Sequence, residues 1–119
     1  MQLTVPLVNF LRSDTVSATL LDLAAQDVSD TQTLPLLSQL RRQYTPEEAG
    51  ILLSQARLRH KAVDKFGDSA TQMLFTEHAL QQASNPRIRQ YRATKLDTSY
   101  PVFDMGCGIG ADSLAMAVA

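Results

Sequence analysis

The sequence has no tryptophan and only one cysteine, Cys107, among its 119 residues. A single cysteine cannot form an intramolecular disulfide, so we expect a protein of the reducing cytoplasm. The two histidines, His60 and His78, lie far apart with no cysteine cluster beside them, so we expect no metal site. No apolar run approaches the roughly 20 residues of a membrane span, and the N-terminus lacks the basic leader of a signal peptide. We therefore expect no membrane partner.

Hydrophobic residues make up 45% of the chain and charged residues 19%, which predicts a globular core and excludes a disordered chain. The formal net charge is −1, but the charges are unevenly distributed. Residues 1–40 carry a net charge of −3, residues 41–95 of +5 and residues 96–119 of −3. The basic middle segment fits either contact with a polyanion or the solvated surface of amphipathic helices.

Up to residue 97, the periodicity of the apolar residues predicts helices joined by short turns. Residues 71–75 are expected to be extended or to form a buried turn, with Phe75 in the core. Residues 97–99 break the helical pattern and mark a domain boundary. We predict a mainly α protein, with a helical domain over residues 1–97. Its helices are expected over residues 16–27, 33–44, 46–66, 77–83 and 86–96, with caps at Ser13 or Asp14, Thr33, Thr45, Thr76 and Asn85.

The helix expected over residues 46–66 has the clearest signals. Thr45 and Glu48 are spaced as a capping box around Pro46, and Gly67 is expected to end the helix. On one face, cations recur every four residues at Arg57, Lys61 and Lys65. The other face is expected to enter the core through Leu52, Ala56, Val63 and Phe66.

The segment 98–119 has a different pattern. Residues 100–105 are expected to form a buried strand, and a glycine-rich turn and a helix over 111–119 follow it. In an open α/β sheet, such a strand, turn and helix commonly hold the nucleotide part of a ligand. The spacing also fits the dinucleotide pattern G-x-G-x-x-[GA], but Asp104 ends the strand, where a carboxylate would repel a pyrophosphate. The carboxylate would instead attract a cationic ligand.

The residues V-F-D-M-G-C-G-I-G resemble the first motif of class I S-adenosylmethionine-dependent methyltransferases, in which an acidic residue precedes a G-x-G-x-G turn. The resemblance implies a Rossmann-like α/β domain that begins at residues 98–119. It also implies S-adenosylmethionine as the cofactor. The residues expected along the methionine end of this donor are Asp104, Gly106, Cys107, Gly108 and Gly110.

Residues 45–119 are also similar to the trimethylguanosine-synthase-like and THUMP-like-domain methyltransferases. Ala111 departs from their pattern, in which a glycine is usual, and residues 1–44 resemble no family that we can name. The resemblance implies an RNA substrate with guanine N2 as a possible acceptor, and Arg57, Lys61 and Lys65 as RNA-binding residues. The matching positions are Arg57, Arg59, Lys61, Lys65, Phe66, Phe75 and Thr76.

A class I methyltransferase domain has a seven-stranded sheet, of which this sequence is expected to hold only the first strand. The catalytic residues would then lie beyond Ala119, and residues 1–119 alone are expected to be inactive. A parallel-type strand without neighbours exposes an edge. We therefore expect residues 100–105 to mediate self-association, or residues 100–119 to rearrange into a helix.

Three other functions stay open at this stage. The acceptor of the methyl group can be a protein or a small molecule in place of RNA. The chain can also be a non-catalytic helical interaction module, in which case the glycine loop has no ligand. A nicotinamide-dependent oxidoreductase is disfavoured by Asp104 and by the long helical region before the first expected strand.

Overall fold

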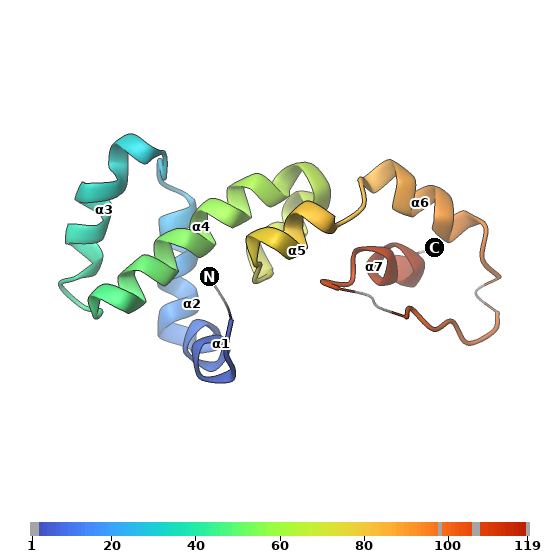
Figure 1. The fold of residues 1–119 in the computed structure, drawn as a ribbon, viewed down its shortest axis with the longest axis horizontal. Coiled ribbons are helices and arrows are strands. Elements are labelled where there is room, and N and C mark those ends of the chain that lie inside the picture. The colour runs from blue at the N-terminus through green and yellow to red at the C-terminus, as the bar shows by residue number, and fades with distance from the viewer. Residues whose placement is uncertain (1–2, 98, 106–107, 119) are drawn as a thin grey trace.

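A computed structural model describes residues 3–97, 99–105 and 108–118. Within these ranges the chain is mainly helical, as predicted, and no β-strand is assigned. None of the described helices is long and apolar enough to cross a membrane. In chain order (Figure 1), the α-helices and the 3-10 helices η1 and η2 are α1 (Val5–Arg12), α2 (Asp14–Ala24), η1 (Asp30–Gln32), α3 (Thr33–Leu40), α4 (Pro46–Phe66), η2 (Gly67–Gln72), α5 (Glu77–Gln82), α6 (Pro86–Thr94) and α7 (Ala111–Val118).

Helix α4 begins and ends where the sequence predicts. The Thr45 hydroxyl accepts a hydrogen bond from the Glu48 backbone N–H at 3.2 Å, and the Glu48 carboxylate accepts one from the Thr45 N–H at 2.9 Å. Pro46 occupies the first turn, and Gly67 follows Phe66 with φ of +56°, which only glycine adopts readily. The caps of α5 and α6 are confirmed too, because Thr76 and Asn85 each accept a backbone N–H.

The first three helices differ from the prediction in their limits. Helix α1 was not predicted, because only Leu11 of its eight residues is buried and so short a segment shows little periodicity. Helices α2 and α3 end three and four residues earlier than expected, at Ala24 and Leu40. The prediction of Thr33 as the cap of α3 was wrong: it is the first helical residue, and its hydroxyl donates to the Asp30 carbonyl at 2.8 Å.

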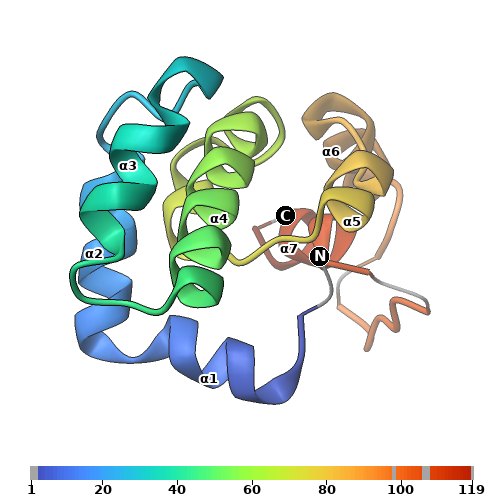
Figure 2. The same cartoon turned by 60° about the vertical axis from the view of Figure 1, so that its left-hand side comes forward.

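The buried residues form two clusters along an elongated molecule of 52 × 28 × 22 Å. The first cluster joins α1, α2, α3 and the first half of α4. The second joins the second half of α4 with η2, α5 and Ala111 of α7. Figure 2 shows α4 between α2 and α3 on one side and α5, α6 and α7 on the other. Among the described helices, α4 alone contributes buried residues to both clusters.

The buried side of α4 turns as the helix passes from one cluster to the other. Leu52 and Ala56 are buried in the first cluster, and Ala62 and Phe66 in the second. The prediction of a single face through Val63 was therefore wrong, and the Val63 side chain is 52% exposed. A helix that changes packing partners along its length does not keep one apolar stripe.

Residues 101–104 have no regular secondary structure, although helix α7 follows the glycine turn as expected. A strand is defined by its hydrogen-bonded neighbour, and the described residues contain no second extended segment that pairs with this one. The large apolar side chains here are exposed, including Phe103 at 85% and Met105 at 90%. The segment therefore has the composition of a strand without the partner that would bury it.

Candidate functional site

The glycine turn before α7 requires glycine for conformational reasons. Gly108 has φ of +58° and Gly110 has φ of +80°, a region that L side chains rarely adopt. The Leu114 N–H donates to the Gly110 carbonyl at 2.9 Å, so the first turn of α7 begins directly at this glycine. A Cβ atom added at either glycine would meet nothing within 4 Å. The backbone is therefore bordered by open space, in which a ligand can lie close to it.

Two of the predicted donor-binding residues, Gly106 and Cys107, lie outside the described residues. Ala111, which departs from the family pattern, is buried at the start of α7 and belongs to the second core cluster. Its methyl group thus packs in the cluster formed by α4, η2 and α5, where a glycine would leave that contact unmade.

Asp104 and Ser113 connect the two ends of the glycine turn. The Ser113 hydroxyl donates to the Asp104 carboxylate at 2.7 Å, and Asp104 is only partly buried. The carboxylate thus lies beside the first turn of α7, where the unpaired backbone N–H groups carry a partial positive charge. It borders a shallow cavity of about 310 Å³, which is lined by Tyr100, Val102, Asp104, Ser113, Met116 and Ala117. A carboxylate at such an edge can accept hydrogen bonds from an ammonium group.

A second acidic residue of this region is engaged within the chain. Asp112 forms an ion pair with Arg92 of α6 at 3.3 Å, and the Arg92 guanidinium also donates to the Ser84 hydroxyl at 2.8 Å. These contacts fasten the start of α7 to α6 and to the turn before it. Asp112 therefore orients the glycine turn and lines, with Gly108, a separate cavity of about 210 Å³, whereas Asp104 lines the cavity beside Ser113.

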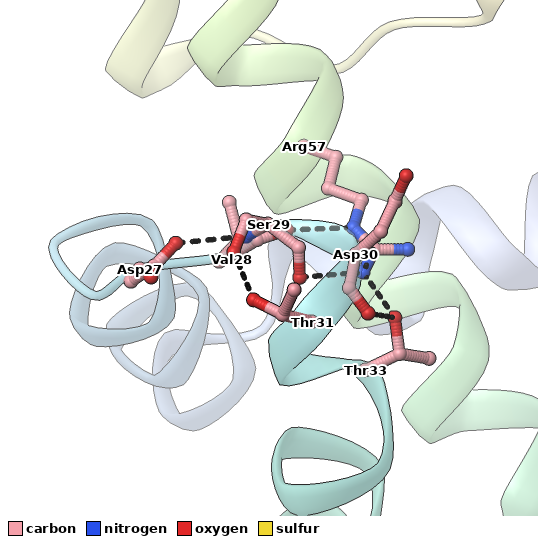
Figure 3. A network of polar contacts seen from close by, with 7 residues as sticks. All are labelled: Asp27, Val28, Ser29, Asp30, Thr31, Thr33 and Arg57. Carbon is pink, nitrogen blue, oxygen red and sulfur yellow. Dashed lines mark hydrogen bonds and ion pairs between the residues drawn. The ribbon is translucent and has the colours of Figure 1, made fainter.

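Arg57, the first residue of the predicted RNA-binding stripe, holds the connection between α2 and α3 (Figure 3). Its guanidinium donates to the backbone carbonyls of Val28 at 2.8 Å and Ser29 at 3.3 Å. It also donates to the Thr33 hydroxyl at 2.6 Å and lies 3.8 Å from the Asp30 carboxylate. These contacts involve Nε and Nη2, which carry three of the five N–H donors of the guanidinium.

The turn that Arg57 holds is also stabilised from within. The Asp27 carboxylate accepts the backbone N–H of Ser29 at 3.0 Å. That hydrogen bond lowers the pKa of Asp27, and the Ser29 hydroxyl and the nearby His60 lower it further. His60 itself lies on the surface, with its Nε2 at 2.6 Å from the carbonyl of Ala24, the last residue of α2.

The other two cations of the predicted stripe contact α5. Lys61 forms an exposed ion pair with Glu77 at 3.6 Å. The Lys65 ammonium donates to the carbonyls of Leu80 at 2.7 Å and Gln81 at 3.2 Å, and so satisfies the C-terminal end of that helix. The stripe does lie along one helix, but each of its three members already has a partner within the chain.

Two buried polar side chains of α4, Gln55 and Arg59, have roles that no local sequence pattern indicates. Gln55 exchanges two hydrogen bonds with the backbone of Phe75, and the Arg59 Nε donates to the Met73 carbonyl at 2.8 Å. Burial lowers the pKa of the Arg59 guanidinium. Together they hold the extended segment before α5, and Phe75 is buried as predicted. No group of three or more His, Cys, Asp or Glu that could hold a metal ion occurs in the part of the chain that the structure describes.

Comparison with known protein families gives a match over the N-terminal helices. Residues 5–62 match the model of a family described as a domain of unknown function (DUF8688). The matched range contains α1, α2, α3 and most of α4, with all residues of the first core cluster. It ends before α5 and the glycine turn. No curated protein and no solved structure matches the chain.

Proposed function

We propose that the chain is the leading part of a class I S-adenosylmethionine-dependent methyltransferase. In this proposal residues 100–105 are the first strand of a Rossmann-like sheet, and the turn before α7 lines the donor site. One observation supports the proposal above the others. Gly108 and Gly110 have positive φ directly before α7, and the Asp104 carboxylate accepts a hydrogen bond from Ser113 in the first turn of that helix.

The electrostatics of the turn favour a cationic ligand. S-adenosylmethionine carries a positive α-amino group and a positive sulfonium, and both are attracted by a carboxylate. A dinucleotide would bring its pyrophosphate toward the same carboxylate and would be repelled. Asp104 is partly exposed at the cavity edge, and its contact with Ser113 is a single hydrogen bond that leaves acceptor capacity on the carboxylate.

The residues of this chain would bind and orient the donor. Asp104 would accept hydrogen bonds from the amino group, and Gly108 and Gly110 would let the backbone approach the methionine part. The bound donor supplies an electrophilic methyl group to a nucleophilic atom of the acceptor. Rate enhancement would rest on positioning, because no residue of this chain is assigned a covalent role.

RNA is the proposed acceptor, with guanine N2 as one possible acceptor atom. Of the three cations expected to contact RNA, Arg57 and Lys65 use their donors within the chain. Lys61 is largely exposed in its ion pair with Glu77 and is the member that can exchange its partner for a phosphate at low cost.

Isothermal titration calorimetry of the protein as its gene encodes it, with S-adenosylhomocysteine and separately with NAD, tests the donor site. We expect S-adenosylhomocysteine to bind and NAD not to bind. Asp104→Asn should weaken binding about tenfold, since a charge-assisted hydrogen bond is removed. Ser113→Ala removes the hydrogen bond that positions Asp104 but keeps the carboxylate, so it should weaken binding less than Asp104→Asn does. Binding of NAD in place of S-adenosylhomocysteine would overturn the assignment.

A non-catalytic helical interaction module is the second candidate. It is favoured by the match of residues 5–62 to a family of their own, since these residues contain a complete core cluster without the glycine turn. A folded protein that binds neither S-adenosylhomocysteine nor NAD in the same titration would favour this candidate.

A further inference from the structure

Helix α6 and its C-cap residue carry four basic residues and no acidic residue. Two of the four contact side chains of other elements. The Arg89 guanidinium lies 4.8 Å from the centroid of the Phe66 ring, and Arg92 forms the ion pair with Asp112. The other two, Arg87 and Lys95, are exposed. Arg89 and Arg92 thus help to hold α6 in place, although the Arg92 side chain stays 56% exposed in its ion pair.

The exposed cations flank an exposed aromatic ring. Arg87, Tyr91 and Lys95 are spaced i, i+4 and i+8, so they lie along one side of the helix over about 12 Å. We call these three residues the α6 stripe. Tyr91 is 63% exposed, and the Lys95 ammonium lies 5.0 Å from the centroid of its ring. Ala93, on another side of the helix, is buried. Figure 1 shows α6 at one end of the molecule, with α7 beside it.

We propose that the α6 stripe binds a single strand of nucleic acid. Two cations provide phosphate contacts, and an exposed ring between them provides a surface for base stacking. A membrane surface would require a broad apolar face, and here Ile88 is the one large aliphatic side chain exposed within α6. An acidic peptide would use the cations but not the ring. A single strand uses both.

The stripe differs from the one expected on α4 in the state of its side chains. Arg57 and Lys65 would have to break hydrogen bonds to backbone carbonyls in order to reach a phosphate. The Lys95 ammonium lies over the face of an exposed ring, an interaction that a phosphate can replace. Binding of a strand to the α6 stripe does not depend on the proposed function. The further step, that the bound strand is the methyl acceptor, rests on it.

Fluorescence anisotropy with a labelled single-stranded RNA of about 12 nucleotides tests the stripe. We expect binding that weakens as salt increases. The double variant Arg87→Glu and Lys95→Glu should weaken it at least tenfold. It should also reduce the slope of log affinity against log salt by about 1.4, because each of the two phosphates no longer neutralised accounts for about 0.7. Tyr91→Ala should weaken binding about tenfold, and Tyr91→Phe should preserve it, because stacking needs the ring and not the hydroxyl.

Arg41→Glu with Arg42→Glu is the matched control. These exposed residues follow α3, and the double variant changes the net charge by the same amount. Circular dichroism establishes that every variant is folded. Equal losses of affinity in the two double variants would overturn the proposal, since only bulk charge would matter. An absence of binding would overturn it too. So would binding to duplex RNA that is equally tight and unaffected by Tyr91→Ala, or tighter binding to anionic vesicles than to the single strand. Because donor binding is measured separately, failure here with S-adenosylhomocysteine still bound rejects the stripe alone.

Discussion

Gln55 and Phe75 hold each other through two hydrogen bonds in the core. The Gln55 Nε2 donates to the Phe75 carbonyl at 2.7 Å, and the Phe75 N–H donates to the Gln55 Oε1 at 3.0 Å. Both residues are fully buried. The side-chain amide thus satisfies a backbone segment that has no strand beside it, as a neighbouring strand otherwise would.

Replacing Gln55 should therefore be costly. Gln55→Leu fills the site with an apolar side chain but leaves the N–H and C=O of Phe75 without partners, and we expect a loss of about 2–4 kcal/mol in the free energy of unfolding. Urea denaturation followed by circular dichroism measures it. Gln39→Leu is the control, because Gln39 is exposed on α3 and should change stability by less than about 0.5 kcal/mol. Equal effects of the two variants would contradict a special role for the Gln55 hydrogen bonds.

Arg57 is expected to act on stability. Arg57→Ala removes the donors that hold the connection between α2 and α3, and we expect a loss of about 1.5–3 kcal/mol in the free energy of unfolding. Lys61→Ala breaks an ion pair between two exposed side chains and should cost less than about 1 kcal/mol. Chemical denaturation of both variants gives the comparison. If Arg57→Ala left stability unchanged but weakened RNA binding, the role expected from the family resemblance would hold for this residue.

Asp27, in the connection between α2 and α3, should make a contribution to stability that depends on pH. The pKa of Asp27 is lowered in the folded chain, first of all by the Ser29 backbone N–H. The stabilisation is then present above the ordinary pKa of about 3.9 and is lost as the pH falls through the lower folded value. Carbon-detected NMR titration should place the Asp27 midpoint below the ordinary value. Asp27→Asn should reduce the acid-side loss of stability, and Gln39→Leu, an exposed change on α3 that removes no titratable group, should not.

The segment 100–105 is the region through which we propose that residues 1–119, taken alone, associate with one another. Its large apolar side chains are exposed, and no strand covers its backbone within the described residues. Sedimentation velocity should show a dimer whose population grows with concentration, and Phe103→Lys should reduce it by placing a charge on the edge. Leu34→Lys is the control, because Leu34 is similarly open to solvent on α3. A monomer at all concentrations would exclude this association.

The sequence predicted the elements whose signals are local. The capping box at Thr45 and the Asn85 cap each fix a helix start through residues a few positions apart. The contacts of Arg57 with residues 28–33 depend on how α4 meets the α2–α3 connection, which no local spacing reveals. The face change at Val63 has the same origin, since it follows from which elements pack on each half of α4.

The glycine turn, too, was predictable only in part. Positive φ at Gly108 and Gly110 was predictable, because glycine is the residue that tolerates it. The hydrogen bond between Asp104 and Ser113 was not predictable, since it depends on the direction in which the segment enters the turn. The α6 stripe could not be predicted from the sequence. All four cations of that segment look alike until the fold places Arg89 against Phe66 and pairs Arg92 with Asp112.

Helix α4 couples the stability of the two core clusters. Because it contributes to both clusters, neither half can melt without fraying the helix on which the other is built. Binding of a methyl donor near Asp104, or of a nucleic-acid strand to the α6 stripe, would therefore stabilise α4. We expect either ligand to slow amide hydrogen exchange along the whole of α4 and in the N-terminal helices.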